Sequence, residues 1–131
     1  MRYMSIVTSP QPMTGPTPAL MEAMGKLAER EIKAGRMIDM GGLMPLQQGA
    51  RVSIEGGKLR VTDGPFVEAK EVIGGFAILN YASHEQAIEG ARRVMQIHAE
   101  HGCTDLEMEL RPMMDPGECG AQVPQQQASA A

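Results

Sequence analysis

Apolar and polar positions recur along the chain with two different periods, which divide it into helices and strands. Residues 18–34 and the stretch from Ala87 to His98 place apolar side chains three or four positions apart, which predicts two amphipathic helices. Six shorter stretches are apolar or alternate apolar with polar residues, which predicts strands. These strands are expected at residues 2–9, 36–46, 51–55, 58–62, 72–81 and 106–112.

Residues with special backbone or capping chemistry mark the ends of these elements. Thr17 and Ser83 stand where each helix would begin, and their hydroxyls suit an N-cap. Gly35 and Gly102 follow the two apolar stripes and are expected to end the helices. Gly56-Gly57 separates two alternating stretches and fits a two-residue hairpin turn.

The predicted order is β-α-β, a hairpin, then β-α-β. Two helices on one face of an antiparallel sheet make an α+β ferredoxin-like sandwich (βαββαβ), here with an inserted β-hairpin. Residues 2–9 and 72–81 carry apolar side chains on both faces, and two helices cover only one face. We therefore expect a second copy of the chain to cover the other face, in a two-fold homodimer.

Phenylalanines and double glycines add three local expectations. Phe76 is expected in the core. Gly41-Gly42 suggests a bulge or a close backbone approach, and Gly74-Gly75 suggests a kink.

The composition sets the scale of the molecule and excludes some functions. The 131 residues make one domain, which we place at residues 1–114, with residues 115–131 as a disordered tail too poor in apolar side chains to order. The net charge is −4 and the basic residues are interleaved with acidic ones, so direct nucleic-acid binding is not expected. The longest uncharged apolar run, residues 72–79, is far below the roughly 20 residues that span a bilayer. No signal peptide is apparent, which favours a cytoplasmic location.

The densest group of chemically active residues is the run from Asp63 to Glu71, DGPFVEAKE. Asp63, beside the Gly64-Pro65 turn, could act as a general base if it is partly buried, or could bond its own turn. In an extended segment Glu68 and Lys70 point to one side and Glu71 to the other. Such a lysine could orient an anion or stabilise an enolate while a carboxylate moves the proton; the alternative is a solvated strip of ion pairs.

Four residues are candidate ligand contacts: Gly64, Pro65 and Phe66 within this run, and Arg111 further along the chain. Phe66 would anchor the loop in the core or form a cleft wall. Arg111, at the end of the last strand, could bind a carboxylate with two hydrogen bonds or form a salt bridge at the rim. The three histidines do not have the spacing of a metal site, and no cofactor motif is present.

The DGPF run with its Glu-Ala-Lys-Glu sequence, the strand that begins with Gly74-Gly75-Phe76 and the terminal Glu109-Leu110-Arg111-Pro112 resemble the YCII-related family, in its DGPF branch. The resemblance covers roughly residues 1–114 and implies a dimeric α/β barrel with a cleft. It places the DGPF segment near that cleft. Some DGPF proteins are associated with extracytoplasmic-function sigma factors, which implies one candidate partner.

The resemblance does not supply a reaction. Some relatives suggest a His–Asp pair with the histidine on the first helix, but residues 18–34 contain no histidine. Three functions stay open. The first is a cleft that binds a small organic acid and catalyses a cofactor-free proton transfer, isomerisation or elimination, with Asp63 or Glu68 as base and Lys70 as electrostatic partner. The second is a non-enzymatic regulatory adaptor of a sigma factor, and the third is a structural dimer without activity.

Overall fold

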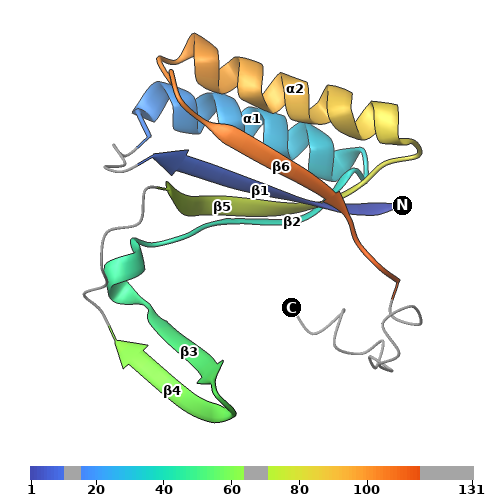
Figure 1. Cartoon of the computed structure of the whole chain (residues 1–131). Helices are drawn as coiled ribbons and strands as arrows, with labels where there is room; N and C mark the ends of the chain where they lie inside the picture. Colours follow the sequence, from blue (N-terminus) through green and yellow to red (C-terminus); the bar gives the residue numbers. More distant parts are fainter. Residues whose placement is uncertain (11–15, 64–70, 116–131) are drawn as a thin grey trace.

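The chain forms a four-stranded antiparallel sheet with two helices on one face, and a separate two-stranded hairpin on the other side (Figure 1). The structure is a computed structural model that describes residues 1–10, 16–63 and 71–115. The elements in chain order are β1 (Arg2–Pro10), α1 (Pro18–Lys33), β2 (Met37–Gly42), the 3₁₀ turn η1 (Leu46–Gln48), β3 (Ala50–Glu55), β4 (Lys58–Asp63), β5 (Glu71–Asn80), α2 (His84–Glu100) and β6 (Glu107–Pro112). The predicted α+β order with an inserted hairpin is confirmed.

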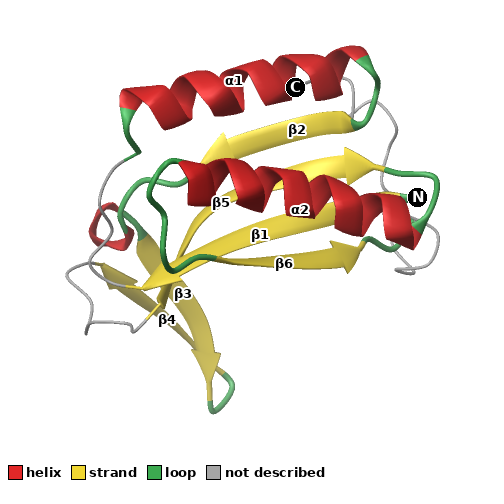
Figure 2. Ribbon diagram, turned by 90° about the horizontal axis from the view of Figure 1, so that it is seen from above, coloured by secondary structure: helices red, strands yellow, loops and turns green. Residues whose placement is uncertain are grey.

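The sheet has the strand order β2-β5-β1-β6, so the first and fifth strands of the chain form its centre. All of its neighbouring strands run antiparallel. Figure 2 shows α1 and α2 lying next to each other over the sheet, with strands visible between them.

The helix ends follow the predicted capping chemistry. The Thr17 hydroxyl accepts a hydrogen bond from the backbone N–H of Leu20, and the Ser83 hydroxyl accepts one from Gln86, both at 3.2 Å. Gly35 follows α1 with a φ of 75°, a left-handed conformation that a side chain would strain.

The core lies between the sheet and the helices. Its buried residues are Tyr3, Ala28, Met37, Leu79, Tyr81 and Ala87. The rings of Tyr3 and Tyr81 meet edge to face with centroids 6.4 Å apart, a geometry that aromatic pairs favour. The Tyr3 hydroxyl also lies 3.3 Å from Nδ1 of His84.

Phe76 is not part of this core. It lies opposite Ile6 on β1, and both are an odd number of residues from the core-facing Tyr3 and Leu79, so they occupy the face without helices. A Cβ on Gly41 would stand 3.0 Å from the Phe76 ring, so the glycine allows the close approach that the sequence suggested. We call this surface the far face; its apolar residues are Met4, Ile6, Ile73, Phe76 and Ile78.

The sheet has two register shifts; one falls where the sequence suggested an irregularity, and the other does not. The pairing of β1 with β5 shifts so that Gly74 is an extra residue between Gly75 and Ile73, which confirms an irregularity at the predicted Gly74-Gly75 position. In β2 the shift falls at Ile38, between Met37 and Asp39, and not at Gly41-Gly42.

The hairpin of β3 and β4 pairs only within itself among the described strands. Gly56 and Gly57 have φ values of 58° and 81°, the two positive angles of a type I′ turn. One face of the hairpin is apolar, and its side chains are strongly exposed: Val52 70%, Ile54 72%, Leu59 78% and Val61 66%. We call these four residues the hairpin apolar face.

No helix in the described parts of the chain is long and apolar enough to cross a membrane. The predicted disordered tail falls, beyond Asp115, outside the described residues.

Candidate functional site

A groove with a volume of about 930 Å³ runs between α1 and α2 above the sheet. Leu20, Met24 and Leu27 form its α1 wall, and Ala91, Val94 and His98 form its α2 wall. The groove has the size and the largely apolar lining of a small-molecule site.

The side chains on the floor of the groove become smaller from one end of the groove to the other. Three successive rows of helix-facing residues cross β2, β5 and β1: Met37, Leu79 and Tyr3; then Met40, Ala77 and Ser5; then Gly42, Gly75 and Val7. At Gly75 an added Cβ would stand 3.1 Å from the carbonyl oxygen of Gly41, so the backbone packing favours glycine there. The two glycines of the last row leave space that large side chains occupy in the first row.

A charged cluster lies at the end of the groove where the floor side chains are large. Glu31, on α1, is only 7% exposed, and Arg36 donates to it through Nε and Nη2, the latter at 3.4 Å. Arg93 of α2 approaches the same carboxylate, with Nη1 3.9 Å from Oε1. Since Arg36 already balances Glu31, the guanidinium of Arg93 supplies a surplus positive charge on the groove wall.

Tyr81 lies beside this cluster and lines the groove. Burial, and next the negative charge of Glu31, raise the pKa of Tyr81 above its ordinary value. The phenol therefore stays neutral at physiological pH and presents a hydroxyl, not a phenolate.

Two histidines line the groove at the last turn of α2 and just beyond it. Nδ1 of His98 lies 2.9 Å from the carbonyl oxygen of Val94, and Nδ1 of His101 lies 2.7 Å from that of Ile97. A carbonyl oxygen only accepts, so Nδ1 is the protonated nitrogen in both rings. In each neutral ring Nε2 is then left as the acceptor, which can take a hydrogen bond or a proton from a ligand.

Ser9, near the end of β1, also lines the groove. Its hydroxyl oxygen is buried and has no hydrogen-bond partner among the described residues. Such an orphan costs about 1–3 kcal/mol unless a ligand or water bonds it.

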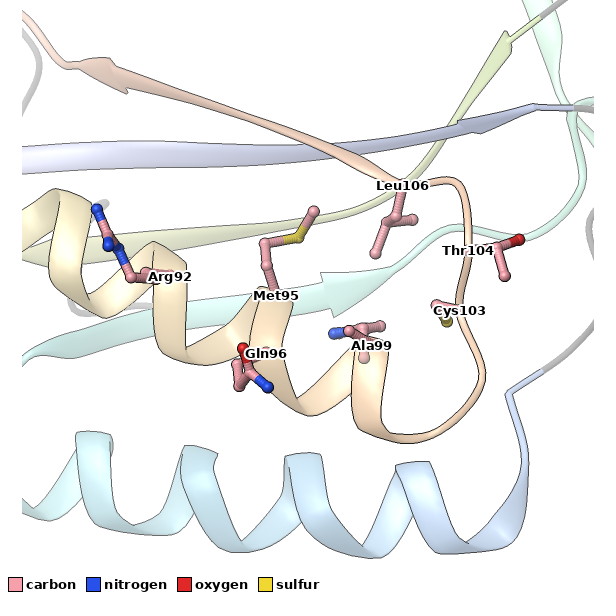
Figure 3. Close-up of a pocket in the computed structure, with 8 residues that line it drawn as sticks. Arg92, Met95, Gln96, Ala99, Cys103, Thr104 and Leu106 are labelled. Carbon is pink, nitrogen blue, oxygen red and sulfur yellow. The ribbon is translucent and has the colours of Figure 1, made fainter.

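A smaller cavity of about 330 Å³ adjoins the groove at the C-terminal half of α2. Figure 3 shows Met95 and Ala99 on the helix facing Leu106 and Cys103 on the connection to β6. His98 lines both spaces, so it stands between the groove and this cavity.

The predicted DGPF site is described only at its two ends. Asp63 is exposed at the end of β4, opposite Ala50, and does not line the groove. The backbone of Glu71 pairs with Pro10, which does line it. Gly64, Pro65, Phe66, Glu68 and Lys70 lie outside the described residues. Of the two described ends, only Glu71 lies next to a residue that lines the groove.

Arg111 is placed away from the groove. It lies opposite Met4, on the far-face side of β6, and its Nη1 is 3.6 Å from Oε2 of Glu109. Both side chains are exposed, which is the rim salt bridge that the sequence left as an alternative. The described residues contain no cluster of three or more side chains suited to a metal ion.

Sequence reasoning missed the charged cluster. Glu31 occurs three and four residues after the apolar Ala28 and Leu27, so a carboxylate on the buried stripe of α1 was visible in the sequence. No signal in the sequence pointed to Arg93 as its neighbour, because α1 and α2 meet only in the folded chain.

Comparison with known proteins agrees with the architecture. The model of the YCII-related domain matches residues 1–105 of this chain. An uncharacterised protein of Rhizobium meliloti (strain 1021) is 29% identical over 101 residues, which cover 76% of this chain and 78% of that protein. The family match spans most of the sequence, from the first strand through both helices, and the chain belongs to the YCII-related domain family.

Proposed function

We propose that this protein binds a small, largely apolar organic acid in the groove between α1 and α2. The proposal rests on the groove itself, whose floor has no side chains at Gly42 and Gly75. Apolar walls favour an apolar ligand body, and a few fixed polar groups would orient it.

The polar groups favour an acid over a base. Arg36 already balances the charge of Glu31, so the positive charge of Arg93 is available to an anion. The Nε2 atoms of His98 and His101 can donate to a carboxylate when protonated or accept from a hydroxyl when neutral. The Ser9 hydroxyl offers a further hydrogen bond that the described protein leaves unused.

Gly25 gives the sharpest test, because it lines the groove and an added Cβ would meet nothing within 4 Å. We would titrate benzoate, salicylate and naphthoate by calorimetry into the wild type, Gly25→Phe and the matched control Gly25→Ala. We expect at least one acid to bind, Gly25→Phe to weaken it tenfold or more, and Gly25→Ala to retain it. Equal binding by Gly25→Phe, or no binding of any acid to the wild type, would contradict the proposal.

Catalysis by the DGPF run is a further proposal, with Asp63 or Glu68 as base, Lys70 as electrostatic partner and Glu71 as a second carboxylate. What supports it is the pairing of the Glu71 backbone with Pro10, which lines the groove. Lys70→Met should leave the fold unchanged but abolish stabilisation by the bound acid. Asp63 does not line the groove of its own chain, so Asp63→Asn tests whether its carboxylate takes part, and we expect the same loss. A thermal shift equal to that of the wild type in both variants would remove these residues from the site.

We also propose that the chain is a homodimer, supported by the apolar far face, which neither α1 nor α2 covers. Sedimentation analysis of the wild type should show twice the mass of one chain. A role as a sigma-factor adaptor, a dimer without activity and the cytoplasmic location stay predictions from the sequence.

A further inference from the structure

We infer that the hairpin apolar face of one copy packs on the far face of a second copy, and that the second copy's hairpin does the same in return. The inference rests on the proposed homodimer and adds to it a specific exchange, in which each hairpin packs on the other copy.

The hairpin needs a surface that the described part of its own chain does not provide. A two-stranded hairpin alone is at best marginally stable in water. All four residues of the hairpin apolar face are at least 66% exposed, and they lie in two directly opposed pairs, Val52 with Val61 and Ile54 with Leu59. The opposite face pairs polar residues, such as Ser53 with Arg60, so the hairpin has one side suited to burial.

The far face is the matching surface. Met4, Ile6, Phe76 and Ile78 form two opposed pairs at the centre of the sheet, Met4 with Ile78 and Ile6 with Phe76. Figure 1 shows the hairpin extending on the side of the sheet opposite the helices, which is the far-face side. When two copies approach through their far faces about a two-fold axis, each hairpin therefore reaches toward the partner's sheet.

The charges of the hairpin leave its apolar face open to burial. Arg51, Glu55, Lys58 and Arg60 all share the polar face with Ser53, and Asp63 lies at the end of β4. Packing the hairpin apolar face against a second copy therefore leaves the four charges of the polar face in water, so the contact avoids the cost of burying them.

A mixed-isotope experiment tests the contact directly. Dimers would be reassembled from one copy with labelled Ile, Leu and Val methyl groups and one deuterated copy with protonated Met and Phe. We expect nuclear Overhauser effects between the copies, from the methyl groups of Ile54 and Leu59 to Met4 and Phe76. A dimer in which the methyl groups of Ile54 and Leu59 show no such effects to the other copy would overturn the exchange and leave the dimer proposal standing. A monomeric wild type would overturn both.

Variants supply an independent measurement. Ile54→Glu places a charge on the hairpin apolar face, whereas Ser53→Glu places the same charge on the polar face one residue away. We expect Ile54→Glu to raise the dimer dissociation constant about a hundredfold or more, since an apolar contact is replaced by a buried carboxylate. Ser53→Glu should change it less than about fivefold. Equal dissociation constants for the two variants would contradict the inference.

Discussion

The hydroxyl of Tyr81 lies directly against Gly90 of α2, so close that a Cβ at position 90 would stand 2.0 Å from the hydroxyl oxygen. The ring carbon that bears the hydroxyl would be 2.7 Å away. Because Tyr81 is buried, it has little room to withdraw. A helix interior would ordinarily favour alanine over glycine, so packing has overridden helix propensity at this position.

Gly90→Ala should therefore destabilise the protein, whereas replacing a glycine by alanine inside a helix usually stabilises it. We expect the free energy of unfolding to fall by about 1–3 kcal/mol, the usual cost of overpacking. Gly25→Ala is the matched control in α1, where an added Cβ meets nothing within 4 Å, and it should raise stability by about 0.5–1 kcal/mol. Urea denaturation measures both, and a stabilising Gly90→Ala would refute the tight contact.

Glu31→Gln should destabilise the protein much more than Glu29→Gln. Glu31 is buried and bonded by Arg36, and its loss as an anion should lower the free energy of unfolding by about 1–3 kcal/mol. Glu29 forms an exposed pair with Lys33 one turn apart, worth about 0.3–0.5 kcal/mol. If urea denaturation gives the two variants equal stability, the buried cluster does not hold the helices together.

Alkaline pH should destabilise the wild type through Tyr81. Burial and the charge of Glu31 raise the pKa of this phenol above its ordinary value of 10.0, so the folded state holds the proton more tightly than the unfolded state. The stabilisation is complete below about pH 10 and is lost as pH rises through the folded pKa. Urea midpoints between pH 8 and 11 should fall more steeply for the wild type than for Tyr81→Phe. Parallel curves would remove Tyr81 as the cause.

Ser9→Ala should separate stability from binding. The hydroxyl is buried without a described partner, so its removal should leave the free energy of unfolding unchanged or raise it by up to about 1 kcal/mol. If the organic acid bonds this hydroxyl, the same variant should weaken binding about fivefold or more. A variant that loses stability but binds normally would show that Ser9 serves the fold alone.

The fold could be predicted from the sequence because its signals are local. Thr17, Ser83 and Gly35 mark helix ends through their own backbone chemistry, and Gly56-Gly57 determines the turn. Each of these features depends on residues only a few positions apart.

The groove could not be predicted in the same way. Its floor depends on Gly42, Gly75 and Val7 lying side by side, and three different strands contribute them. The bulge at Ile38 also escaped prediction, because it depends on the register of β2 against β5. The placement of Phe76 on the far face was readable from its odd spacing to Leu79, but its apolar character favoured the core.

The backbone N–H of Leu43 donates to the carbonyl oxygen of Gly74 at 3.0 Å, just after β2 ends. β2 and β5 are antiparallel neighbours, so the hairpin of β3 and β4 is an insertion between two strands that already pair. The Leu43–Gly74 bond joins the outgoing and returning chain at the root of this insertion. The hairpin and the sheet are therefore separable modules: a change in the length or sequence of the hairpin need not alter the register of β2 with β5, on which the floor of the groove depends.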